Sequence, residues 1–197
     1  MATFTDREPS LSGNRSCTFR TDEVTASQEF RKAYESKLNV VLAEDMPWEQ
    51  SADGLIKHLV HEKLNTREMC VEAYMQFLKP GEKSGRHRHM WEEIIFVVEG
   101  SGYDLHWDLK FDCLDKYSWE WAEEPRRYEW RRGDFIYVPP FSIHQHFNDD
   151  PKEEAILLVF KAKPLFLFMH LLFQKIVEWP SKIPPKGAEN YKPPSDI

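Results

Sequence analysis

The feature that most constrains the fold is a pair of segments, residues 81–100 and 133–148, in which histidines are spaced for one face of a β-strand. His87 and His89 are two residues apart, and Glu93 has the same parity four residues later. Side chains two residues apart leave an extended strand on the same face. The spacing therefore predicts that two imidazoles and a carboxylate converge within a β-structure.

The second segment adds imidazoles from a strand far along the chain, because His144 and His146 again share one parity. Two imidazoles, a carboxylate and a third imidazole around open coordination positions suit Fe(II), Mn, Ni, Cu or Zn. A structural zinc site would instead be closed by tight ligands and richer in cysteine. Because such side chains are costly to bury without a cation, we expect a catalytic metal centre with the ligands His87, His89, Glu93 and His144.

Both segments resemble the two sequence motifs of the cupin superfamily. The first motif, G-x5-H-x-H-x3-E-x6-G, is matched at Gly81, His87, His89, Glu93 and Gly100. The second, G-x5-P-x-G-x2-H-x3-N, is matched at Gly133, Pro139, His144 and Asn148, with Phe141 in place of the second glycine. The aromatic residue followed by a His-x-His pair is similar to gentisate 1,2-dioxygenases. The resemblance implies a β-barrel, and its closer branch implies Fe(II), O2 and a small hydroxylated aromatic acid as substrate.

The central segment also has the pattern of short strands separated by turns, such as the turn at Pro80 and Gly81. The residues from 103 to 111 alternate between apolar and polar, and we expect the apolar face to point toward the metal cavity. The residues from 113 to 132 are rich in charge and are interpreted as a loop. The fold class predicted is all-β, a double-stranded β-helix of the jelly-roll type, with strands expected within 55–60, 69–78, 94–98, 103–111, 135–138, 143–147 and 155–161.

Three segments are expected along the chain: an N-terminal arm and helix (1–53), the barrel (54–162), and a C-terminal helix with an extended tail (163–197). Apolar residues three and four apart predict a helix over 25–42, which would cap the barrel or reach a partner subunit. A second helix is expected to start at Pro164, a position that proline tolerates, and to include the apolar run 164–177. Its wide apolar surface favours burial against the barrel and a second subunit, so we expect a homodimer.

Composition limits the function classes. A net charge of −7 and a pI near 5.6 argue against nucleic acid as a partner, because phosphate backbones require clustered Lys and Arg. The three cysteines, Cys17, Cys70 and Cys113, are odd in number and unpatterned, which indicates reduced thiols in a cytoplasmic protein. The first residues do not have the pattern of a signal peptide, and the run 164–177 is too short to span a bilayer. We therefore expect no membrane partner.

Candidate substrate contacts come from the inward faces of the expected strands. Three roles are open for His146: a further metal ligand, a substrate hydrogen-bond partner or proton shuttle, or a core histidine. The family resemblance favours the substrate role, for which an imidazole is suited because it titrates near neutral pH. Arg86 and Arg88 alternate with the histidines, so they point away from the cavity, and salt bridges are favoured over substrate binding. The residues that we expect to line the cavity, although strand aromatics are often core, are Gln76, Tyr103 and Trp107.

The leading functional hypothesis is an Fe(II)-dependent dioxygenase that acts on a small, anionic, hydroxylated aromatic acid with O2. The metal must offer adjacent open positions for this chemistry, and four protein ligands would leave about two sites of an octahedron. We therefore expect Glu93 to be a loose ligand or to be displaced. The alternatives are a non-redox metal-dependent cupin (a lyase, decarboxylase or isomerase) and a non-catalytic cupin that binds a small molecule.

Overall fold

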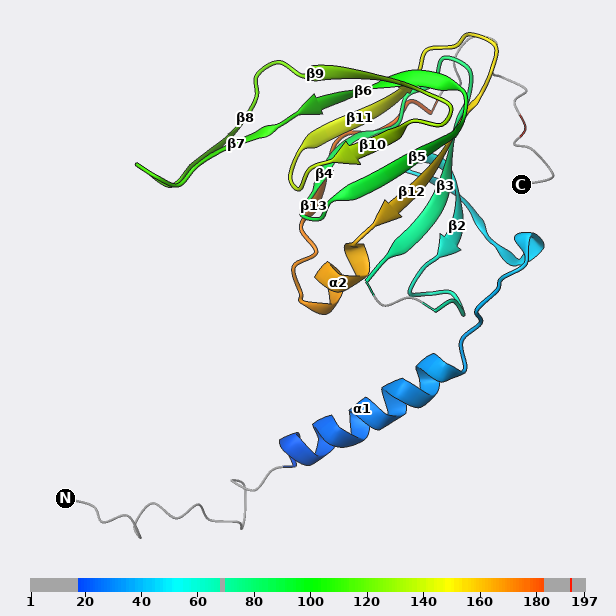
Figure 1. The fold of residues 1–197 in the computed structure, drawn as a ribbon, viewed down its shortest axis with the longest axis vertical. Coiled ribbons are helices and arrows are strands. Elements are labelled where there is room, and N and C mark those ends of the chain that lie inside the picture. Colours follow the sequence, from blue (N-terminus) through cyan, green and yellow to red (C-terminus); the bar gives the residue numbers. More distant parts are fainter. Residues whose placement is uncertain (1–17, 68–69, 183–191, 193–197) are drawn as a thin grey trace. The chain divides into compact units, whose positions relative to one another are not determined.

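The computed structural model describes residues 18–67, 70–182 and 192 (Figure 1). The chain divides into two compact units, residues 1–37 and 38–197. The expected N-terminal arm up to residue 17 and most of the expected C-terminal tail lie outside the described residues.

The first unit contains helix α1 (Phe19–Glu35), in which no side chain is buried. Ion pairs between side chains three or four residues apart run along its surface. The helix predicted over Thr25–Leu42 thus begins earlier and ends at Glu35. Ser36 is its C-cap, and Leu38, which belongs to the second unit, forms a bridge with Thr66 of that unit.

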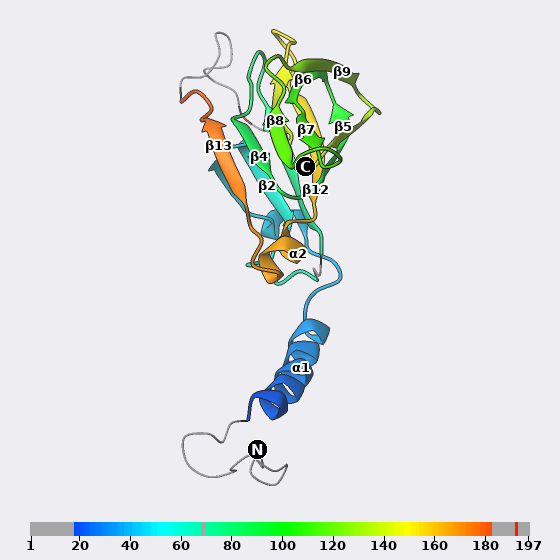
Figure 2. The same ribbon diagram turned by 90° about the vertical axis from the view of Figure 1, so that its left-hand side faces the viewer.

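The second unit is built from two antiparallel sheets, and the predicted all-β jelly-roll fold is confirmed (Figures 1 and 2). The larger sheet has the order β1-β2-β3-β12-β5-β10, and the smaller has the order β13-β4-β11-β6-β9. The strands of the larger sheet are β1 (Trp48–Ser51), β2 (Gly54–Val60), β3 (Glu72–Leu78), β12 (Ala155–Lys161), β5 (Glu93–Glu99) and β10 (Phe135–Val138). Those of the smaller sheet are β13 (Gln174–Glu178), β4 (Arg86–His89), β11 (Ile143–Asn148), β6 (Ser101–Trp107) and β9 (Arg126–Arg131).

The C-terminal helix is much shorter than predicted. Helix α2 (Lys163–Phe168) ends after two turns, and His170 has a positive φ of 57° that breaks the helical path. Residues Gln174–Glu178 instead form β13, whose backbone pairs with the edge of β4. An apolar run fits either a helix or a buried strand, and here the unpaired edge of β4 favours the strand.

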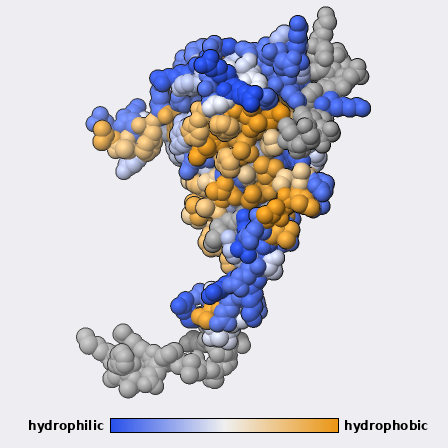
Figure 3. All heavy atoms as spheres, turned by 45° about the vertical axis from the view of Figure 1, so that its right-hand side comes forward, coloured by the Kyte–Doolittle hydropathy of each residue, from blue (hydrophilic) through white to orange (hydrophobic). Residues whose placement is uncertain are grey.

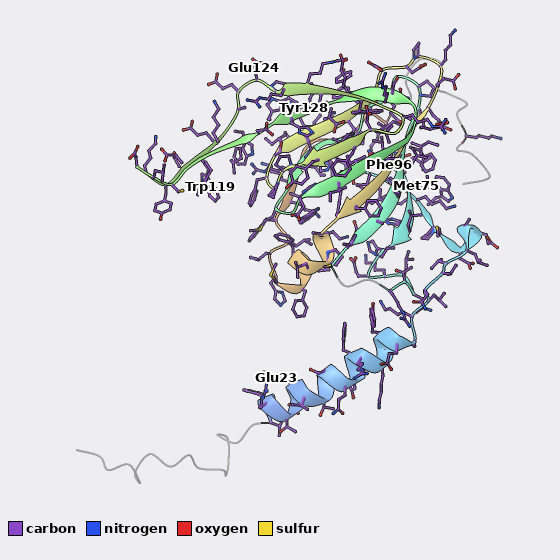
Figure 4. All side chains as sticks on the ribbon, viewed as in Figure 1. Glu23, Met75, Phe96, Trp119, Glu124 and Tyr128 are labelled. Atoms are coloured by element: carbon purple, nitrogen blue, oxygen red, sulfur yellow. The ribbon has the colours of Figure 1, made fainter. Side chains whose placement is uncertain are left out.

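The segment expected to be a loop, 113–132, contains strand β9 of the smaller sheet and the second strand of a hairpin, whose first strand is the end of the one expected over 103–111. Strands β7 (Leu109–Asp112) and β8 (Ser118–Trp121) pair only with each other (Figure 1). Its two strands alternate Phe and Trp with charged residues, which is a strand pattern that the abundance of charge had obscured. Trp119 on this hairpin is 64% exposed (Figure 4).

The barrel interior is divided between apolar and polar side chains. Apolar residues of the larger sheet form the core cluster, which includes Ile56, Leu78, Ile95, Val97, Val138, Leu157 and Val159. Histidines, carboxylates and a lysine occupy the remaining interior, and they lie on β4, β5, β6, β11 and β12. This polar part of the barrel contains the candidate site.

The outer face of the larger sheet is apolar and accessible. Phe96, Phe135 and Tyr137 are 43%, 62% and 50% exposed, and Phe96 pairs across strands with Phe135. Figure 3 shows apolar side chains gathered on one face of the barrel, and Figure 4 labels Phe96 and Met75 there. Among the described helices, none is long and apolar enough to cross a membrane.

Candidate metal centre

The four predicted metal ligands lie together in the barrel interior. His87 and His89 come from β4, Glu93 begins β5, and His144 lies on β11 directly across from His87. One potential ligand atom of each lies within 4.8 Å of those of the others, and all four residues are buried. The register of three strands therefore brings these side chains to one point.

Each histidine is oriented by a hydrogen bond from its Nδ1 to a backbone carbonyl. His87 Nδ1 lies 3.1 Å from the Gly85 oxygen, and His144 Nδ1 lies 3.0 Å from the Ser142 oxygen. The same bond from His89 Nδ1 reaches the Trp91 oxygen at 2.7 Å. With the proton on Nδ1, His87 Nε2 and His144 Nε2 keep their lone pairs and are directed at the cluster, which is the arrangement that metal-binding histidines adopt. His89 Nε2 instead lies 3.0 Å from Glu93 Oε2.

Three atoms of the cluster have no hydrogen-bond partner in the part of the chain that the structure describes: His87 Nε2, His144 Nε2 and Glu93 Oε1. Buried polar atoms are rarely left unpaired, because desolvating them is costly. Burial lowers the pKa of His87 to about 4 and that of His144 well below its usual value, so both imidazoles are neutral, as metal binding requires. The residues present thus fit a divalent metal ion.

Glu93 has a second set of partners that sequence reasoning missed. Its Oε2 lies 3.0 Å from Lys161 Nζ and 3.0 Å from His89 Nε2. Lys161 is buried, stands 3.6 Å from Asp53 and lies 4.9 Å from the centre of the Tyr74 ring. Burial alone would raise the pKa of Glu93, but Lys161, followed by His146 and His89, holds it well below its usual value. The carboxylate is therefore charged and shared between Lys161 and the cluster.

A signal for Lys161 was present in the sequence. Leu157, Val159 and Lys161 share one parity on β12, and the first two belong to the core. A lysine at an inward position of an apolar strand indicates a buried cation with a carboxylate partner. Asp53, in the turn before β2, had no comparable signal.

His146 faces the same interior but bonds to a different carboxylate. Its Nδ1 lies 2.9 Å from Asp104 Oδ2, and its Nε2 lies 3.6 Å from Glu93 Oε1. Asp104 also accepts a hydrogen bond from Trp130 Nε1 at 2.8 Å and lies 3.4 Å from His106 Nε2. Burial acts to lower the pKa of His146, but Asp104 and Glu93 outweigh it and raise the pKa to about 10. His146 therefore carries a positive charge at neutral pH.

The prediction that the apolar face of β6 points toward the cavity was wrong. Asp104 and His106 are the buried residues of this strand, whereas Tyr103 and Trp107 lie on its outer face. Tyr103 lies against the Arg127 guanidinium, and Trp107 lies 5.0 Å from that of Arg86. Cation–π contacts stabilise Tyr103 and Trp107 on the outer face of the strand. Asp104 and His106 face the interior, where they interact with the charged groups near the cluster.

Gln76, in contrast, is fully buried inside the barrel as expected. Its Nε2 donates to the backbone oxygen of Asp53, and its Oε1 has no partner. An unpaired buried acceptor is suited to a donor group of a bound molecule.

A second group of metal-ligand type lies elsewhere, formed by His61, Glu62 and Glu72. Lys163 forms an ion pair with Glu72 and has its Nζ 3.6 Å from Glu62. The ammonium group already supplies the positive charge there, so this group is an ion-pair cluster.

The barrel and its motif residues define a member of the cupin superfamily. Within it, the chain belongs to the auxin binding protein family, which matches residues 37–175.

The similar proteins include enzymes and binding proteins. Gentisate 1,2 dioxygenase 1 of Aquipseudomonas alcaligenes is 31% identical over 80 residues, which cover 41% of this chain and 18% of that protein. Auxin-binding protein T85 of Nicotiana tabacum is 25% identical over 101 residues, which cover 51% of this chain and 50% of that protein. Among solved structures, the chain is similar to salicylate 1,2-dioxygenase from Pseudoaminobacter salicylatoxidans with gentisate, with a TM-score of 0.51 and 12% identity. The match covers 90% of this chain and 41% of that chain, and at this identity it shows the fold alone. The chain spans half or less of the length of these relatives.

Proposed function

We propose that this protein is a metal-dependent dioxygenase that acts on a small hydroxylated aromatic acid, with Fe(II) as its metal. The observation that carries the proposal is the convergence of His87 Nε2, His144 Nε2 and Glu93 Oε1, three unpaired buried atoms, beside His89. The name of the gentisate dioxygenase to which the chain is similar supports the substrate class.

His87, His89 and His144 would hold the metal, with Glu93 as a weaker fourth ligand. Bound Fe(II) supplies adjacent open positions and redox chemistry suited to O2. Glu93 is already engaged through Oε2 by Lys161 and His89, so only Oε1 is unpaired. Lys161 thereby keeps one carboxylate oxygen away from the metal and preserves room for a substrate.

His146 would bind the substrate as a hydrogen-bond donor. The sequence left open that His146 removes a proton from the substrate, but an imidazole whose pKa is raised to about 10 has no free lone pair at neutral pH. Asp104 fixes the ring through Nδ1, so Nε2 is the atom that can donate to a phenolate or carboxylate oxygen. Gln76 Oε1 is the matching acceptor for a substrate hydroxyl.

The test is oxygen uptake by protein loaded anaerobically with Fe(II) and offered gentisate, other hydroxybenzoates and catechols. We expect uptake with a hydroxybenzoate and none in His144→Ala. The same measurement with His170→Ala, a histidine outside the cluster, is the control and should match the wild type. Firm metal binding without oxygen uptake from any of these compounds would refute the proposal and favour a lyase, decarboxylase or isomerase.

A second candidate function is the binding of an aromatic carboxylic acid without turnover. It is favoured by the family assignment and by relatives whose names state that they bind auxin. Calorimetry with indole-3-acetate and zinc-loaded protein separates the two. Binding that needs the metal and leaves the compound unchanged, together with no oxygen uptake from hydroxybenzoates, would establish this function.

A further inference from the structure

A groove of about 440 Å³ lies on the outer side of the smaller sheet, lined by residues of β4, β13 and the β7–β8 hairpin. Figure 2 shows where these strands lie. Arg88 and Lys175 supply its charge, and Trp119, Trp121, Phe141 and Phe173 supply its aromatic walls. Arg88 stands between His87 and His89 on β4, whose side chains are buried on the opposite face. The groove is therefore separate from the candidate metal centre.

The two cations of the groove lie side by side and lack a carboxylate partner. Lys175 pairs across strands with Arg88, which places both side chains on one face. No ion pair involves either of them among residues 18–67, 70–182 and 192. Like charges directly opposite each other on a sheet are destabilising. In a chain with a net charge of −7, this pair forms a local positive site that an anion would stabilise.

Arg88 is held in a position to bind such an anion. Its guanidinium lies 4.0 Å from the centre of the Trp121 ring. Trp121 is fixed in turn, because its Nε1 donates to the Phe141 oxygen at 2.9 Å. The N–H donors of a guanidinium lie in its own plane. When this plane stacks on an indole, the donors remain free to bind a carboxylate or sulfonate.

The aromatic wall is also held by the backbone. Phe141 has a φ of 63°, in the left-handed region that non-glycine residues seldom adopt. Its N–H donates to the His89 oxygen at 2.7 Å, which anchors the turn against β4. A glycine would fit this backbone without strain, but it would remove a ring that lies 6.4 Å from Trp119 and closes the groove.

We propose that this groove is a second ligand site, which binds a small organic anion consisting of a planar ring with a carboxylate or sulfonate group. The aromatic walls cover the faces of the ring, and Arg88 and Lys175 receive the anionic group. The volume is within the usual range for small-molecule sites, about 300–1,000 Å³. Because the groove shares no side chain with the metal cluster, binding there does not require a metal.

The test is calorimetric titration of the metal-free full chain with 2-naphthoate. We expect one site per chain, weakened about tenfold in Arg88→Met and in Lys175→Met, since each variant removes one charge-assisted contact. Lys175 is exposed, so its substitution leaves the fold intact. The charge-matched control is Lys152→Met, an exposed lysine in the loop before β12, and it should bind like the wild type.

Two further measurements decide where the probe binds and why. His144→Ala should retain the affinity, and 2-naphthalenemethanol, the neutral analogue, should bind at least tenfold more weakly than 2-naphthoate. The proposal is overturned by the absence of binding, by unchanged affinity in both groove variants, or by equal affinity for the neutral analogue. Loss of binding in His144→Ala would also overturn it, because the probe would then occupy the cavity of the metal cluster.

Discussion

Replacement of Lys161 by methionine tests whether a buried ammonium group substitutes for part of the metal's charge. Lys161 Nζ lies 3.0 Å from Glu93 and 3.6 Å from Asp53, and the lysine and Glu93 are almost fully buried. Removing one partner of a buried ion pair leaves the other charge uncompensated, at a cost of about 3–5 kcal/mol. We expect Lys161→Met to lower the free energy of unfolding of the metal-free protein by an amount in this range.

A divalent ion at the histidine cluster would restore the missing positive charge beside Glu93. The fall in the free energy of unfolding caused by Lys161→Met should therefore be smaller with zinc bound than without it, by at least about 1.4 kcal/mol. This difference corresponds to zinc binding about tenfold tighter than in the wild type. Urea denaturation with and without zinc, combined with zinc titration, measures both quantities.

The control is Lys57→Met, which removes another buried ammonium group, one that lies 5.4 Å from the centre of the Trp48 ring and outside both groups of metal-ligand type. We expect that variant to lose the same stability with and without zinc. If Lys161→Met also lost equal stability in both states, or bound zinc more weakly than the wild type, Lys161 would not share Glu93 with a metal, and the reasoning would be wrong.

Four further predictions follow from particular contacts. The pKa of His87 is lowered from 6.5 to about 4, so between these pH values the unfolded chain binds a proton that the folded chain does not, and the free energy of unfolding should fall by roughly 3 kcal/mol as the pH drops from 6.5 to about 4. Denaturation of metal-free His87→Asn at several pH values should lack this part of the pH dependence of stability, and an unchanged pH dependence would contradict the assignment. Asp104→Asn removes the main group that raises the pKa of His146, so NMR titration should find that pKa below its wild-type value of about 10, and an unchanged value would assign the effect to Glu93 alone. Gly102→Ala would place a Cβ in collision with the backbone oxygen of Phe147, and we expect the free energy of unfolding from urea denaturation to fall by at least about 2 kcal/mol. An unchanged midpoint would show that β6 and β11 can separate there. The homodimer stays a prediction, which the apolar outer face of the larger sheet favours, and light scattering that gives the mass of one chain would remove it.

The metal cluster could be predicted from the sequence because strand geometry has a period of two. His87, His89 and Glu93 keep one parity within a short segment, so no knowledge of distant pairing was needed to place them together. The same rule failed for β6. The alternation of apolar and polar residues was clear, but the polar face points to the interior and the apolar face points outward. Asp104 and His106 point inward because charged groups already occupy that end of the interior, which a rule based on hydrophobic burial does not anticipate.

The elements that were missed depend on long-range pairing. Strand β13 overlaps the end of the apolar run 164–177, in which a helix was expected, but three of its five residues are polar, and its pairing with the edge of β4 makes it extended. Lys161 was visible as a lysine on the inward face of an apolar strand, but its partner Asp53 lies in a turn far from it in sequence. Such pairs depend on the tertiary register, which local periodicity does not encode.

The order of the cluster residues along the chain has a consequence for folding. His87, His89 and Glu93 belong to one local segment, whereas His144 joins them only through the pairing of β11 with β4. An unfolded or partly synthesised chain can therefore capture a metal ion with the first three side chains before the barrel closes. Metal bound in this way stabilises the unfolded chain as well, which reduces the net gain from loading, but it also brings β4 and the start of β5 together early. Closure of the coordination shell by His144 would then coincide with the slow, long-range step of forming the smaller sheet.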